Sequence, residues 1–95
     1  MAHTKPEMIE DLILELNAIR NLDGIKEKSV GIYYYKSIPF LHFHDKNGDR
    51  WADVKTPGGY KRVDITFRAK NSDKKRFLKS VYSAHATLAK GRVKL

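Results

Sequence analysis

Apolar residues recur at helical spacing near the beginning of the chain. Residues 4–7 (Thr-Lys-Pro-Glu) have the form of a capping box with proline in the first turn, which predicts that a helix begins there. Asp23 and Gly24 predict its end, because glycine favours the left-handed conformation just past a helix. The apolar positions lie mostly three or four residues apart, on one helix face: Ile9, Leu12, Ile13, Leu16 and Ile19.

A second helical pattern occupies the last quarter of the chain. Asn71, Ser72 and Asp73 are residues that favour a helix N-terminus. Gly91 predicts the end of this helix, and residues 92–95 are expected to form a frayed tail. The apolar stripe consists of Phe77, Leu78, Val81, Tyr82, His85 and Leu88.

Between the two helices the pattern changes to alternation with a period of two, which predicts strands. We expect four, at about residues 30–35, 40–45, 50–55 and 60–68. Residues 36–39 form a turn that contains Pro39, and residues 56–59 form another. Asn47 and Gly48 give the strongest hairpin signal, because a type I′ turn needs positive φ at both positions.

Turn lengths then predict the register of the sheet. A four-residue loop at 36–39 pairs Tyr34 with Leu41 and Tyr33 with His42, and one at 56–59 pairs Asp53 with Arg62. A two-residue turn at Asn47 and Gly48 pairs Asp45 with Arg50, His44 with Trp51, Phe43 with Ala52, His42 with Asp53 and Leu41 with Val54.

This register divides the sheet into two faces. The apolar face must be covered by the amphipathic helices. The predicted fold is therefore an α+β two-layer sandwich, in which a helix, a four-stranded antiparallel meander and a helix follow one another, with both helices on one face of the sheet. We expect a single domain over residues 1–95, with an ordered core at about 4–90. The apolar face comprises Val30, Ile32, Tyr34, Leu41, Phe43, Ala52, Val54, Val63, Ile65 and Phe67.

The opposite face is unusually rich in aromatic residues for a surface exposed to water, and such patches often mark interaction sites. Tyr60, Asp64 and Thr66 belong to it. The candidate binding residues are Tyr33, Tyr35, Phe40, His42, His44, Trp51, Asp53, Lys55, Arg62 and Arg68.

His42, His44 and Asp53 form the candidate for metal chemistry. Two histidines two residues apart on a strand project to the same side, and a carboxylate across the ladder completes a two-histidine, one-carboxylate set. The competing interpretation, which we favour, is a His42–Asp53 hydrogen bond beside a His44–Trp51 stack. A histidine with an orienting carboxylate also suits acid–base chemistry, but no nucleophile motif or phosphate loop accompanies it. His85, on the apolar helix stripe, is expected to be a half-buried core residue.

Composition narrows the class of protein. The chain contains no cysteine, which excludes disulfides and thiolate metal sites and favours a reducing compartment. No apolar run is long enough to span a bilayer, and no signal peptide is evident, so we expect a cytoplasmic protein without a membrane partner. A net charge of +8 favours anionic partners, although charge also serves solubility alone.

Two kinds of partner fit the aromatic face. Aromatic residues interleaved with arginine and lysine are typical of surfaces that bind single-stranded nucleic acid, although Asp53 and Asp64 oppose a polyanion there. Two copies of the face could instead pack together in a homodimer. The sequence therefore predicts a non-enzymatic binding or interaction domain without a cofactor. The alternative is a small enzyme or metal-dependent site at His42, His44 and Asp53.

A Leu-His-Phe-His run at residues 41–44 is followed by Ala-Asp-Val at 52–54. In these residues the chain resembles a family of small bacterial proteins, of about the same length, to which no function is assigned. The resemblance implies a bacterial conserved hypothetical protein and supplies no catalytic residues.

Overall fold

The computed structural model describes the backbone of residues 5–93 and the side chains up to residue 90. It has the α+β class that the sequence predicts. In chain order the elements are α1 (Pro6–Ile9), the 3-10 helix η1 (Glu10–Leu12), α2 (Ile13–Arg20), β1 (Ile25–Ser29), β2 (Ile32–Tyr35), β3 (Ile38–Lys46), β4 (Asp49–Thr56), β5 (Gly59–Asp64) and α3 (Asn71–Val93).

The sheet has five antiparallel strands in the order β1-β2-β3-β4-β5, so the prediction of four strands is wrong. The additional strand, β1, lies at the edge of the sheet and reads Ile-Lys-Glu-Lys-Ser. This sequence has no alternation of apolar and polar residues, so the pattern gave no sign of a strand. Its backbone hydrogen bonds with β2 hold it in the sheet. A hydrogen bond from the Lys36 N–H to the Gly24 carbonyl, 2.7 Å long, ties the entry of β1 to the end of β2.

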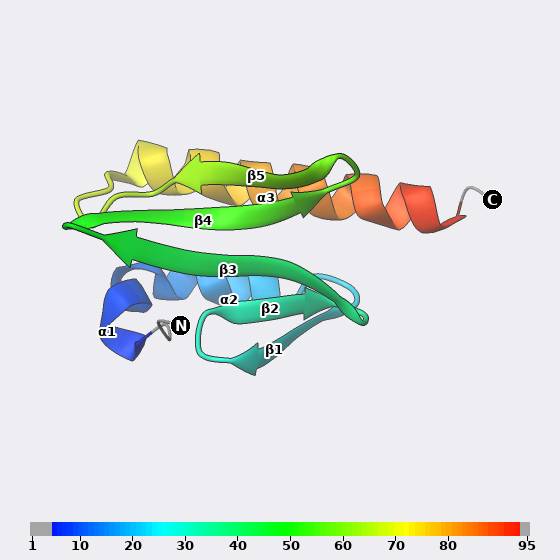
Figure 1. Ribbon diagram of the computed structural model, residues 1–95, viewed down its shortest axis with the longest axis horizontal. Coiled ribbons are helices and arrows are strands. Elements are labelled where there is room, and N and C mark those ends of the chain that lie inside the picture. The colour runs from blue at the N-terminus through cyan, green and yellow to red at the C-terminus, as the bar shows by residue number, and fades with distance from the viewer. Residues whose placement is uncertain (1–4, 94–95) are drawn as a thin grey trace.

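Figure 1 shows α2 behind β2 and β3, and α3 behind β4 and β5. A single core joins these helices to the sheet. Leu16 and Ile19 of α2 and Phe77 and Val81 of α3 are buried in the same cluster as inward-facing strand residues such as Phe43. Burial of these apolar side chains is the main favourable term in folding.

The first helix is not continuous as predicted. Backbone angles at Ile9 (φ −130°, ψ 11°) and Leu12 (φ −104°, ψ 17°) leave the α region and divide it into α1, η1 and α2. The break turns Ile13 outward, 59% exposed, whereas the other members of its predicted stripe are buried. The predicted cap at Thr4 lies outside the described residues.

The C-terminal helix begins at Asn71 as predicted. The Asp73 carboxylate accepts a hydrogen bond from the Lys70 backbone N–H at 2.9 Å, which satisfies one of the unpaired groups at the helix start. The helix continues through Gly91 to Val93, so the predicted end at Gly91 is wrong. Intrahelical bonding outweighs the modest cost of one glycine. The last two residues of the predicted tail lie outside the described residues.

Arg50 fastens the N-terminal segment to the sheet. Its side chain is buried, and its guanidinium donates to both Asp11 carboxylate oxygens, at 2.7 and 3.0 Å. It also donates to the backbone carbonyls of Met8, Ile65 and Thr66, so that all five N–H donors are used. The ring of Phe67 lies 4.8 Å from the guanidinium carbon.

Candidate functional site

The β3–β4 hairpin carries the candidate site, and its register is the one predicted from the turn. Asn47 and Gly48 have φ of 54° and 85°, as a type I′ turn requires. The five predicted pairs are all present, and the β4–β5 pair of Asp53 with Arg62 is present too. His42, His44 and Trp51 therefore share a face with Asp53.

The register of β2 differs from the prediction by one residue. The turn consists of two residues in place of four, with a positive φ of 57° at Lys36, and this moves the pairing by two residues. The irregularity between Tyr33 and Tyr34 reverses one of the two, so Tyr33 pairs with Leu41 and Ile32 with His42. A one-residue shift moves every side chain to the opposite face. Tyr33 and Tyr35 are consequently core residues, 0% and 2% exposed, and the prediction that they line the binding face is wrong.

Two further predicted binding residues do not belong to the open face. Phe40 is fully buried, because the irregularity between β2 and β3 turns it toward the helices, where its ring meets His85 at 6.3 Å. Arg68 lies beyond the end of β5 at Asp64, so it lies in the loop that leads to α3. Val30 and Phe67 were expected on the apolar face, but both lie outside the strands, as Arg68 does. They are 40% and 39% exposed.

The open face is thus smaller and less aromatic than the sequence indicated. Its residues are half-buried or exposed, and on β2, β3 and β4 they alternate with buried residues. It comprises Ile32, Tyr34, His42, His44, Trp51, Asp53, Lys55, Tyr60, Arg62 and Asp64.

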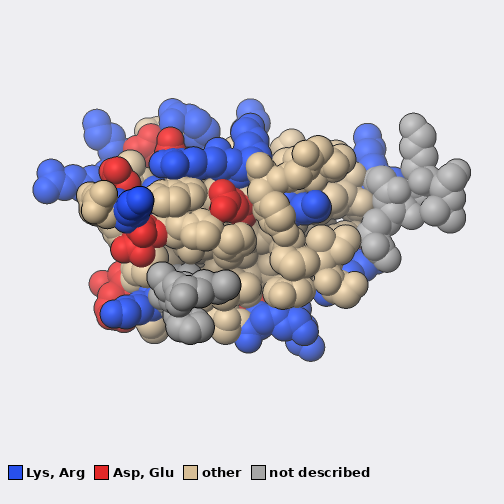
Figure 2. All heavy atoms as spheres, viewed as in Figure 1, with Lys and Arg blue, Asp and Glu red and all other residues tan. Residues whose placement is uncertain are grey.

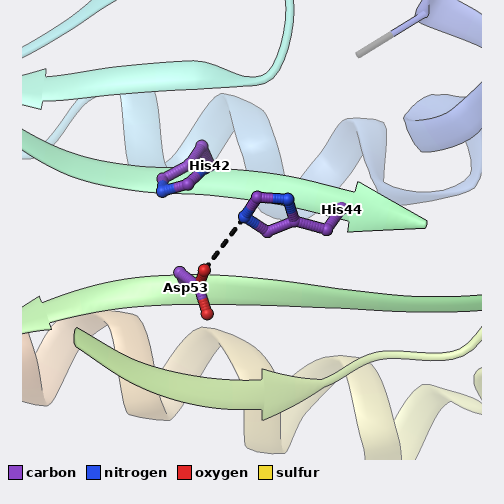
Figure 3. A group of neighbouring side chains, drawn as sticks. All are labelled: His42, His44 and Asp53. Atoms are coloured by element: carbon purple, nitrogen blue, oxygen red, sulfur yellow. Dashed lines mark ion pairs between the residues drawn. The ribbon is translucent and has the colours of Figure 1, made fainter. Parts of the chain in front are cut away.

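His42, His44 and Asp53 converge at the centre of this face, as Figure 3 shows. One ligand atom from each side chain can be chosen so that all three lie within 4.8 Å of one another. Nε2 of His44 lies 2.9 Å from Oδ2 of Asp53. Among the described residues this buried nitrogen makes no hydrogen bond, so it lies close to the carboxylate without hydrogen-bond geometry.

The favoured sequence interpretation is therefore correct in one part and wrong in the other. His44 stacks on Trp51, with centroids 5.5 Å apart and planes 23° apart. The carboxylate of Asp53, however, contacts His44 in place of His42, although His42 is its neighbour in the ladder. The two imidazoles meet edge to face at 4.5 Å.

Aromatic and cationic neighbours flank the cluster. The guanidinium of Arg62, from β5, lies 4.2 Å from the centroid of Trp51, while His44 contacts the same ring from β3. Tyr60 meets His42 edge to face at 6.0 Å, and its hydroxyl donates to the Pro39 carbonyl at 2.9 Å. These contacts restrict the rotamers of both imidazoles.

Electrostatics favour the neutral form of one histidine. Partial burial lowers the pKa of His42, and the neighbouring His44 lowers it further, while Asp53 acts in the opposite direction. Neutral imidazole is the form that coordinates a metal ion. The cluster can therefore offer two nitrogens and one carboxylate oxygen from two adjacent strands.

His85 is the half-buried core histidine that its place on the helix predicted. Its Nε2 lies 2.6 Å from the Asp23 carbonyl oxygen, and its ring meets Tyr35 edge to face at 5.3 Å. Its role is to join α3 to the turn before β1, so it takes no part in the open face.

In the part of the chain that the structure describes, no helix combines the length and apolar character needed to cross a bilayer. Comparisons of the chain with family models, curated proteins and solved structures find no match.

Proposed function

We propose that this protein is a small binding domain that holds a divalent transition-metal ion at His42, His44 and Asp53. The observation that supports this most directly is the convergence of three ligand atoms within 4.8 Å on one sheet face. In a tetrahedral site with metal–ligand bonds of about 2.0 Å, neighbouring ligand atoms lie about 3.3 Å apart. Small side-chain rotations therefore suffice to bring the three atoms to a common ion.

The state of the side chains is compatible with metal entry. The side chains of His44 and Asp53 are 38% and 28% exposed, so both reach the surface of the sheet, and a rotation of the His44 ring would bring its buried Nε2 to an ion. We take both helices to cover the opposite side of the sheet, which leaves the side with the cluster open. The single core that joins the helices to the inward-facing strand residues supports this arrangement. Metal coordination would also replace the poorly aligned contact of the buried His44 Nε2 with Asp53.

The ligand set favours a particular class of metal. Two imidazoles and one carboxylate suit zinc, iron, nickel or copper, whereas calcium and magnesium prefer oxygen ligands alone. Three protein ligands leave at least one coordination position for water or a small molecule. With no nucleophile motif in the sequence, we assign a binding role and no reaction.

Thermal unfolding with and without zinc tests the proposal. At a zinc concentration about 100 times the dissociation constant, binding stabilises the native state by about 2.7 kcal/mol, or about 13 °C in a domain of this size. Asp53→Asn removes the carboxylate with little change of shape, so we expect this zinc-dependent shift to disappear.

Asp64→Asn is the matched control, because Asp64 lies on the same face but pairs with Arg62 and is not a member of the cluster. We expect this variant to keep the full shift. The proposal is wrong if wild type shows no shift with zinc, or if both variants retain it equally.

A second candidate function is an interaction surface for an anionic partner such as single-stranded nucleic acid. It is favoured by aromatic rings that each have a cation close by. Arg62 lies over Trp51, Lys55 Nζ lies 5.1 Å from the Tyr60 centroid, and Lys28 Nζ lies 5.5 Å from that of Tyr34. Affinity for a single-stranded oligonucleotide should then fall steeply as the salt concentration is raised. Binding that does not depend on salt, or no binding, contradicts this second function.

A homodimer is a further alternative, which sedimentation at high protein concentration tests. A single species of 11.0 kDa would exclude the homodimer.

A further inference from the structure

A groove separate from the histidine cluster lies between β4–β5 and α3. Its volume is about 320 Å³, at the lower end of the range for small-molecule sites. Lys61, Arg76 and Lys79 contribute cations to its wall, and Ser80 and Ser83 contribute hydroxyls. None of these residues belongs to the histidine cluster.

The periodicities of the two elements explain why these groups meet. Lys61 pairs in the ladder with the buried Val54, so it projects to the helix side of β5, whereas the next residue, Arg62, projects to the open face. Along α3 the lining residues recur at alternating intervals of three and one, which places them on one helix face. These residues are Arg76, Lys79, Ser80, Ser83, Ala84 and Thr87.

The positive charge of the groove is only partly neutralised. Within residues 5–90, neither Lys61 nor Lys79 forms an ion pair, and Arg76 makes a single long contact to Asp73 at 3.3 Å. The side chain of Arg76 is 74% exposed, so it can move toward a ligand. Figure 2 shows lysine and arginine gathered along the margin of the molecule where Figure 1 places β5 and α3.

The floor of the groove is apolar. Val54 is buried and Val63 and Ala84 are largely so, and their side chains line the hollow beneath the cations. A ligand that complements this lining therefore carries both negative charge and an apolar part. Three cations and two hydroxyl donors exceed what one carboxylate can use, but they match the three oxygens and double charge of a phosphate monoester.

We propose that the groove between β5 and α3 binds a small organic phosphate monoester. Lys61, Arg76 and Lys79 neutralise its phosphate, and the hydroxyls of Ser80 and Ser83 donate hydrogen bonds to it. The apolar part of the ligand contacts Val63 and Ala84. This site is independent of the metal site, because it uses different residues on the other side of the sheet.

Titration of the full-length ¹⁵N-labelled protein with phenyl phosphate, followed by NMR, tests this proposal. We expect saturable shifts of backbone amides centred on Lys61, Ser80 and Ser83. Lys79→Glu and, independently, Lys61→Glu each place a negative charge beside the phosphate, so each should weaken binding at least about tenfold.

Lys75→Glu is the matched control, because it makes the same change of charge on the same helix at an exposed residue that does not line the hollow. It should bind phenyl phosphate as wild type does. The proposal is overturned if the shifts do not saturate, if Lys75→Glu weakens binding as much as Lys79→Glu, or if the shifts centre on the histidine face.

Titrations with two other ligands identify the class of ligand that the groove binds. Inorganic phosphate should bind more weakly than phenyl phosphate, since it lacks the apolar part, and equal affinity contradicts the assignment of an organic ligand. A single-stranded oligonucleotide that binds in the groove while phenyl phosphate does not would likewise overturn it. In that case the cations would serve a polyanion, as the net charge of +8 also permits.

Discussion

At the scale of single residues, Arg50 makes the largest set of polar contacts in the described chain. Burying a guanidinium is costly unless its donors and its charge are all satisfied. Asp11 neutralises the charge, and three backbone carbonyls accept the remaining hydrogen bonds. Removing one partner leaves the other groups unpaired, so stability should be sensitive to either residue of the pair.

This pair predicts a pH dependence of stability. The hydrogen bond from Arg50 is the main reason why the pKa of Asp11 is lowered below 3.8. Because the folded-state pKa is the lower one, the carboxylate stabilises the native state fully above the unfolded pKa, and this contribution is lost as pH falls through the folded pKa. Asp11→Asn should cost about 1 kcal/mol at pH 6, a value discounted for the partial exposure of Asp11.

Urea unfolding of wild type and Asp11→Asn at pH 6 and at low pH checks this expectation. The difference between the two proteins should shrink as the wild-type carboxyl group becomes protonated. A difference that stays constant from pH 6 to well below pH 4 contradicts the assigned role of the ion pair.

The exchange of faces in β2 leads to a second prediction. Tyr33 is buried, and burial raises the pKa of its hydroxyl, whereas its neighbour Tyr34 is half-exposed on the open face. Tyr33→Ala should therefore destabilise the protein by about 3 kcal/mol or more, as core truncations do, and Tyr34→Ala by much less. A larger loss of the urea midpoint in Tyr34→Ala than in Tyr33→Ala would mean that the strand has the register that the sequence suggested, and equal losses would contradict the exchange of faces.

The partners of Arg50 show what sequence patterns could not reach at this scale. Its ladder pair with Asp45 followed from the turn alone. Asp11 and the Met8 carbonyl, however, lie 39 and 42 residues away in the sequence, and only tertiary packing brings them to Arg50. Because these partners are distant in the sequence, the residues next to Arg50 do not indicate that its side chain is buried.

At the scale of elements, the β3–β4 hairpin is the best specified part of the fold. Its turn residues demand one geometry, and that geometry fixes every pair in the ladder. The turn between β2 and β3 has no such signal. Pro39 suggested a longer loop, yet it lies within β3, and Lys36 provides the positive φ in place of a glycine. The shorter turn and the irregularity between Tyr33 and Tyr34 together put the predicted register of β2 one residue out at Leu41.

Two glycines allow the role of turn geometry to be measured. Gly48 has a φ of 85°, and no atom lies within 4 Å of an added Cβ, so Gly48→Ala introduces backbone strain without a steric clash. We expect a loss of about 1 kcal/mol in the free energy of unfolding. Gly58→Ala, equally open in space but without a positive φ, should be nearly neutral. Similar losses in the two variants would contradict a special role for the turn conformation.

At the scale of the whole molecule, we propose two sites that share no residue. The open face carries the histidine cluster, and the groove beside α3 is lined by Lys61, Arg76 and Lys79. The membership of the cluster could be predicted, since strand alternation and one well-specified turn place His42, His44 and Asp53 together. The contact of Asp53 with His44 could not, because it depends on side-chain rotamers that adjacent Trp51 and Tyr60 restrict. The groove depends on how α3 lies along β5, which no local pattern encodes.

The metal-binding claim is tested most directly by the X-ray absorption spectrum of the protein loaded with one equivalent of zinc. The account predicts a low-coordinate zinc with nitrogen and oxygen ligands at about 2.0 Å and the multiple-scattering features of two imidazoles. The imidazole features should fall to one in His44→Asn. A six-coordinate shell of oxygen alone, unchanged in His44→Asn, would show adventitious surface binding and contradict the account.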